Sequence, residues 1–259
     1  MILREIKIRW KSLLFWAIGF AFMIIGGMTK FDTFSAGGSQ DLNQFIQSMP
    51  RIMRIIYGME GIDISTFTGY FGLLLLYVLI MASIHGAFLG ASLIHQEFKD
   101  RTADFLFVKP MSRDHILLRK LGSGLVMILI LEAVIAACCF YVFNESGQLP
   151  LFGKTLAATL ATHVFFFGLG FLFTVLLPKS RQGQQLALVI ILVSYLSISL
   201  SQLYDQPWIR NLSPIGWYYA RLYQSGTSEL WLAGGILLTL SLGFLVLAIV
   251  RFRRKDIPN

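Results

Sequence analysis

Charged residues are scarce in this chain of 259 residues: only 14% are Asp, Glu, Lys or Arg, whereas 56% are hydrophobic. Soluble globular domains contain about 25% charged residues, so the composition excludes a disordered protein and argues against a soluble enzyme. Cysteine is scarcer still, and the two that are present, Cys138 and Cys139, are adjacent within an apolar run. Adjacent cysteines cannot link distant loops, and we interpret them as small apolar packing residues.

Motifs for the common catalytic, nucleotide-binding and metal sites are also lacking. The string closest to a P-loop, at residues 147–155, has one residue too many between its two glycines. Neither His-Glu-x-x-His nor Gly-x-Ser-x-Gly occurs, and the histidines show no metal-ligand spacing. We therefore expect no catalytic site, no metal site and no cofactor in this chain.

Long uncharged runs dominate what is present. Together they contain only one Asp, Glu, Lys or Arg residue, which is Glu132. The six runs cover residues 12–29, 70–94, 121–143, 155–177, 185–204 and 231–250. Because a helix needs about 20 apolar residues to cross a bilayer core, the sequence predicts an all-α membrane protein with six transmembrane helices. We expect one domain over residues 1–259, embedded in the lipid bilayer of the cell (inner or plasma) membrane.

The net charge of +8 is unevenly distributed between the connecting segments. The side that holds both termini carries 16 Lys and Arg residues and the other side carries 6. The positive-inside rule then predicts that both termini are cytoplasmic. The basic excess is thus a topology signal, and we expect no nucleic-acid partner. Residues 1–11 alternate charged and apolar side chains, which favours an interfacial segment on the inner leaflet.

Two outer segments have helical patterns. Residues 41–57 place apolar side chains on one face, and Pro50 either kinks this helix or begins a second one. The helix either lies on the outer membrane surface or acts as a lid over an exit path. Further along, Ser213 can cap a short helix whose first residue is Pro214.

The longest inner loop, between the second and third runs, predicts an amphipathic helix at residues 97–109. Phe98, Thr102, Phe105 and Leu106 share one face, and Pro110 ends the helix. Such a helix either rests on the inner leaflet or docks into a groove on a soluble partner.

The run HQEFKDRTADFLFVKPMSRDHILLRK, residues 95–120, resembles the cytoplasmic signature of type-two ABC exporter permeases. The matching residues are Glu97, Thr102, Asp104, Leu106, Pro110, Ser112, Arg113 and Lys120. Arg101 replaces the usual glycine and Phe105 replaces one leucine. The six-run pattern, the basic N-terminal segment and Leu212-Ser213-Pro214 extend the resemblance over nearly the whole chain.

The resemblance implies that residues 97–109 form a coupling helix that docks on a separate ATPase subunit. The residues implied in coupling are Glu97, Phe98, Arg101, Thr102, Asp104, Phe105, Leu106, Pro110 and Arg113. ATP and magnesium would then bind to the partner, which is expected in two copies. The permease would pair with a second copy of itself or with a paralogue.

Glu132 is the residue of the membrane interior that most suggests a function, because an ionisable group there is costly. His85 and His163 lie in other spans at depths that allow either to pair with Glu132. The three residues are candidates for a substrate pathway, or for a purely structural hydrogen bond between helices. Gly86 and Gly90 form a small-residue face that permits close helix packing, within the subunit or between two copies.

These features together predict the permease subunit of an ATP-driven exporter for a hydrophobic or amphipathic cargo, with antimicrobial or amphipathic peptides as one class. An ion-coupled secondary transporter would carry several intramembrane charges and a sequence repeat, neither of which is visible. An intramembrane enzyme would need paired catalytic groups, which only Glu132 with a histidine approaches. A membrane assembly factor that transports nothing remains open.

Overall fold

The computed structural model describes residues 2–31, 44–93, 113–177, 180–219 and 227–253. All regular structure in these ranges is helical. Within the described residues, six helical segments are long and apolar enough to cross a membrane, in agreement with the predicted number of spans. They are Leu3–Phe31, Phe67–Ser92, Leu117–Glu145, Pro150–Leu176, Arg181–Leu203 and Trp231–Phe252. Each overlaps its uncharged run and extends beyond it at one or both ends.

The first span is one continuous helical segment with a local change of pitch. It consists of α1 (Ile2–Ala21), a π-helical turn (Phe22–Gly26) and a last turn that ends at Phe31. Residues 2–11 are therefore the first turns of this long helix and not a separate segment. Their position on the membrane surface stays a prediction.

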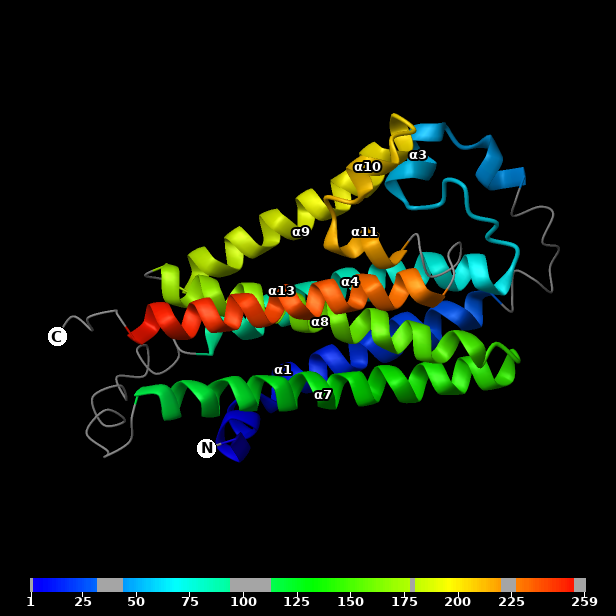
Figure 1. Ribbon diagram of the computed structural model, residues 1–259. Helices are drawn as coiled ribbons and strands as arrows, with labels where there is room; N and C mark the ends of the chain where they lie inside the picture. Colours follow the sequence, from blue (N-terminus) through cyan, green and yellow to red (C-terminus); the bar gives the residue numbers. More distant parts are fainter. Residues whose placement is uncertain (1, 32–43, 94–112, 178–179, 220–226, 254–259) are drawn as a thin grey trace.

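The other long helices are α4 (Phe67–Ser92), α7 (Arg113–Glu145), α8 (Pro150–Leu176), α9 (Ser180–Leu203) and α13 (Thr227–Arg253). They run roughly along one direction, with α4 and α8 central and α1 beside α7 (Figure 1). We call the end where α1 and α7 begin and α13 ends the terminal end. The short helices α3 (Arg51–Ile56) and α10 (Pro207–Arg210) lie at the opposite end. Helix α9 leaves the bundle and extends toward them.

Two glycines explain why α4 and α8 pack so closely. A Cβ atom on Gly86 would lie 2.5 Å from the backbone oxygen of His163, and one on Gly90 would collide with the backbone oxygen of Phe167. The contact also gains a hydrogen bond, because the Thr174 hydroxyl donates to the Gly90 carbonyl oxygen at 3.0 Å. The small-residue face predicted for the second span is thus used within the subunit.

Most of the remaining core is aromatic and aliphatic. Phe166, Phe167 and Phe171 of α8 are fully buried, so this phenylalanine cluster is a packing core. Cys138 and Cys139 are free thiols buried within α7, as the composition predicts. By contrast, α9 and α13 expose many large apolar side chains, such as Val189, Leu192 and Leu242. An exposed apolar face of this kind is suited to lipid contact.

Candidate functional site

Three polar clusters lie at different levels along the bundle. The interior cluster consists of His85 on α4, Glu132 on α7, and Thr159 and His163 on α8. The terminal cluster, near the terminal end, and the latch cluster, at the opposite end, are defined below. Buried polar groups in an otherwise apolar bundle are costly unless they are hydrogen-bonded, so the interior and terminal clusters, which are buried, indicate specific roles.

The interior cluster is a continuous chain of hydrogen bonds. His163 Nδ1 lies 3.1 Å from Glu132 Oε1, and His163 Nε2 lies 2.7 Å from His85 Nδ1. The Thr159 hydroxyl donates to Glu132 Oε2 at 2.8 Å. All four side chains are buried. The structure therefore brings together the three residues that the sequence placed at similar depth.

Local helix geometry explains this convergence. Thr159 and His163 are four residues apart, so they project from the same face of α8. The close approach of α4 to α8 at Gly86 brings the neighbouring His85 within reach of His163. On its other side, the His85 ring meets the Trp16 indole edge-on, with a centroid distance of 5.4 Å.

A cavity of about 280 Å³ adjoins the interior cluster at His85. Its polar lining comes from Arg9 and Ser12 on α1, Ser92 on α4 and Gln184 on α9. Because α1 and α9 begin at the terminal end and α4 ends there, this cavity lies between the interior cluster and the terminal end. It gives His85 a neighbouring space in which water can be held.

The terminal cluster joins the N-terminal helix to α7 and α4. Lys120 Nζ lies 2.5 Å from Glu5 Oε1, and both side chains are almost fully buried. Arg9 Nε lies 3.7 Å from Glu5 Oε2, and the Arg9 guanidinium donates to both the hydroxyl and the carbonyl oxygen of Ser92, at 2.7 and 3.1 Å. Lys120, which the family resemblance singled out, thus anchors the start of α1.

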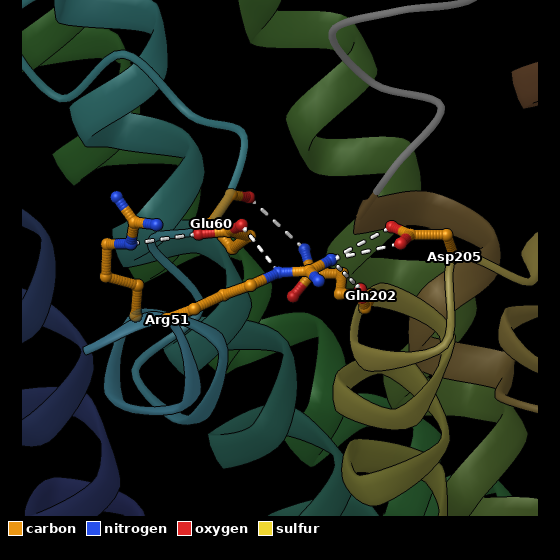
Figure 2. Close-up of polar contacts among 5 residues, drawn as sticks. Arg51, Glu60, Gln202 and Asp205 are labelled. Carbon is orange, nitrogen blue, oxygen red and sulfur yellow. Dashed lines mark hydrogen bonds and ion pairs between the residues drawn. The ribbon is translucent and has the colours of Figure 1, made fainter. Parts of the chain in front are cut away.

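The latch cluster ties α3 to the end of α9, and Figure 2 shows most of its contacts. It consists of Arg51, Arg54, Glu60, Gln202 in the last turn of α9, and Asp205 just after that helix. Arg51 Nη2 lies 3.0 Å from Asp205 Oδ1 and donates to the carbonyl oxygen of Gln202 at 2.8 Å. Glu60 accepts from Arg51 Nε at 3.2 Å and pairs with Arg54 at 3.0 Å. The carboxylates of Asp205 and Glu60 raise the pKa of the exposed Arg51 guanidinium, so this residue stays cationic.

A second and larger cavity, of about 530 Å³, opens beside the latch cluster. Arg51, Glu60 and Asp205 contribute to its wall, together with the first turns of α4 and the last turns of α9. The sharp bends of its rim use positive φ angles, at Gly61 and at Asp205, where φ is 53°. The cavity is mixed in polarity and carries charges of both signs.

Both predictions of short outer helices can be compared with the described residues. Residues 44–48 are helical, and α3 begins directly after Pro50, so the proline starts a second helix. The Gly216 amide donates to Ser213 Oγ at 2.9 Å, and α11 (Pro214–Tyr219) begins at Pro214, which confirms the predicted cap.

The predicted coupling residues lie almost entirely outside the described residues. Residues 94–112 include Glu97, Phe98, Arg101, Thr102, Asp104, Phe105, Leu106 and Pro110. Arg113 is the first residue of α7. The coupling assignment therefore stays a prediction.

Sequence reasoning missed Glu5, Thr159 and the latch cluster. Thr159 had a usable signal, because its spacing from His163 places it on the same helical face. Glu5 had a weaker signal as the one acid in a basic segment. Glu60 lies only nine residues from Arg51, but Gln202 and Asp205 are more than 150 residues away, and no local pattern could have identified them as partners.

Within the described residues, no group of three or more His, Cys, Asp or Glu side chains is arranged to hold a metal ion. The chain is thus an apolar bundle of six potential spans with polar contacts between helices. A search of curated proteins found no match. A family model described as "ABC-2 family transporter protein" matches residues 1–257. Since this match covers nearly the whole chain, the protein belongs to the ABC-2 transporter family, as a multi-span membrane permease subunit that has no ATPase domain and works with a partner ATPase.

Proposed function

We propose that this permease exports a hydrophobic or amphipathic cargo, with amphipathic peptides as one class, and that both termini are cytoplasmic. The observation that carries the proposal is the full-length family match on a bundle with six potential spans. Support for the orientation comes from the excess of Lys and Arg at the terminal end. Support for the cargo class comes from the apolar surface of the spans, which has few polar groups to bind a hydrophilic solute.

Energy for export would come from ATP and magnesium bound to the partner ATPase, which we propose to be present in two copies. Two permease chains, identical or paralogous, would form the membrane part. Residues 97–109 would dock on the ATPase, with Phe105 as the apolar contact and Arg101 as the charged contact. This assignment rests on the resemblance of residues 95–120 to the permease signature.

The docking assignment predicts that Phe105→Asp and Arg101→Glu each abolish copurification of the ATPase subunit with the tagged permease. A carboxylate at Phe105 would have to be desolvated in the docking groove, and the Arg101 reversal would place like charges together. Phe45→Asp is the matched control, because Phe45 is exposed at the opposite end of the bundle. Normal copurification of the Phe105 and Arg101 variants would refute the docking assignment.

We further propose that the two cavities lie on the cargo route. His85 would contact cargo or water in the cavity near the terminal end, with Glu132 and His163 behind it. The cavity beside the latch cluster would form the exit, and α3 would act as its lid. The contacts of Arg51 with Gln202 in α9 and with Asp205 just after it support this role, because they join the lid to a long helix that reaches the terminal end.

The lid assignment predicts that Arg51→Glu opens the outer cavity, because it places a carboxylate against Asp205 and Glu60. A cysteine introduced at Ser201, which lines this cavity and is 7% exposed, should then react faster with a membrane-impermeant maleimide added outside. Arg51→Lys is the control that keeps the charge. Equal labelling rates in all three backgrounds would show that the latch cluster does not close the cavity.

A further inference from the structure

The interior cluster has a property that export alone does not require: its three titratable side chains are linked end to end. Glu132, His163 and His85 are joined by contacts of 3.1 and 2.7 Å, and His85 lines the cavity near the terminal end. We propose that this chain is a proton-binding site, in which one proton taken from that cavity is delivered to Glu132.

The hydrogen bonds permit two complete arrangements. Between the histidines, one of the two facing nitrogens carries the hydrogen and the other accepts it. In the first arrangement His85 Nδ1–H donates to His163 Nε2, and His163 Nδ1–H donates to the Glu132 carboxylate. In the second, neutral Glu132 donates to His163 Nδ1, and His163 Nε2–H donates to His85 Nδ1. Every contact within the chain is satisfied in both arrangements.

One proton converts the first arrangement into the second. It binds at His85 Nε2, which has no hydrogen-bond partner within the described part of the chain. The Nδ1–H bond of His85 then breaks as an Nε2–H bond forms on His163. The Nδ1–H bond of His163 breaks as an O–H bond forms on Glu132. No other reactant is needed. The combined charge of the Glu132, His163 and His85 side chains changes from −1 to 0.

Burial gives the protonated arrangement its stability. A lone carboxylate in a low-dielectric interior is costly, whereas a neutral acid that keeps its hydrogen bonds is not. The carboxylate arrangement is supported by two donors, the Thr159 hydroxyl and the His163 ring. These opposing effects allow both arrangements to exist, and chains of Asp, Glu and His inside membranes commonly carry protons.

Groups on the surrounding helices also act on this site. Arg9 of α1 lines the same cavity as His85, and two positive charges in one cavity repel each other. Cys139 of α7 lies within electrostatic range of Glu132. From α9, the side chain that lines the cavity is the neutral amide of Gln184. Helix α13 packs on α8 through Ser241, whose hydroxyl donates to the Val164 carbonyl oxygen. Arg9 therefore favours passage of the proton away from His85 and toward Glu132.

Infrared difference spectroscopy between alkaline and acidic pH tests this inference on the full-length chain, purified in lipid nanodiscs with the subunits that copurify. We expect a protonated-carboxyl band to appear on acidification and to be absent from Glu132→Gln. In Glu132→Asp a shifted band should remain, which separates loss of the proton site from loss of folding. His85→Gln and His163→Gln keep a hydrogen-bonding amide but cannot relay a proton, so uptake after a pH jump should slow by about a hundredfold.

Two results would overturn the proton site. One is a Glu132 band that does not change over the pH range in which the protein stays folded. The other is uptake in both histidine variants at the wild-type rate and extent. Neither result would affect the docking assignment, because copurification of the ATPase does not depend on the protonation of Glu132.

Discussion

Valine in place of Gly86 is expected to destabilise the bundle by about 3 kcal/mol, at the upper end of the range for overpacking. The added side chain would begin 2.5 Å from the backbone oxygen of His163, and a backbone atom cannot rotate away as a side chain can. The two central helices would have to separate, which would also lengthen the contact between His85 and His163. Thermal unfolding of the purified protein measures the loss.

Gly243→Val provides the matched control for this prediction. Gly243 lies on an exposed part of α13, and a Cβ atom there would meet nothing within 4 Å. Both variants carry the same residue change within a helix, so the difference between them isolates the contact between α4 and α8. Equal unfolding temperatures for the two variants would show that the close approach does not limit stability.

Lys120→Met is expected to cost about 3–5 kcal/mol, because it removes one partner of a buried ion pair and leaves the other charged. Among the described residues, Glu5 would then keep the more distant Arg9, at 3.7 Å, in place of the 2.5 Å contact with Lys120. Combining Lys120→Met with Glu5→Gln removes both charges and should recover much of the loss. Unfolding measurements on the two single variants and the double variant give the coupling energy.

Lys7→Met is the control, because Lys7 is exposed on the same helix and its replacement should change stability little. Strictly additive losses from Glu5→Gln and Lys120→Met would contradict the prediction, since they would mean that the two side chains do not interact. A loss in Lys7→Met as large as that in Lys120→Met would contradict it as well.

The sequence predicts the spans well, because about 20 apolar residues in a row have few alternatives to crossing a bilayer. It predicts the interior cluster in part. The depths of Glu132, His85 and His163 follow from counting residues along each helix, but the direction in which each side chain points depends on helix rotation. That rotation is set by packing, here by the contact of α4 with α8 at Gly86 and Gly90.

The clusters at the two ends could not be predicted, because they join segments far apart in sequence. Glu5 and Lys120 are separated by 115 residues, and Arg51 and Asp205 by 154. In the sequence each of these charges resembles an ordinary residue near a membrane boundary. Their pairing becomes visible only when the helices are placed side by side.

The central claim is that residues 97–109 of this ABC-2 permease dock on the partner ATPase. Its most direct test is a photo-crosslinking amino acid at position 105 of the permease in its native membrane, with the same probe at the exposed Trp208 of the opposite end as the control. We expect the ATPase subunit to be crosslinked from position 105 and not from position 208. Crosslinks from position 105 to lipid alone, in membranes that contain the ATPase, would contradict it.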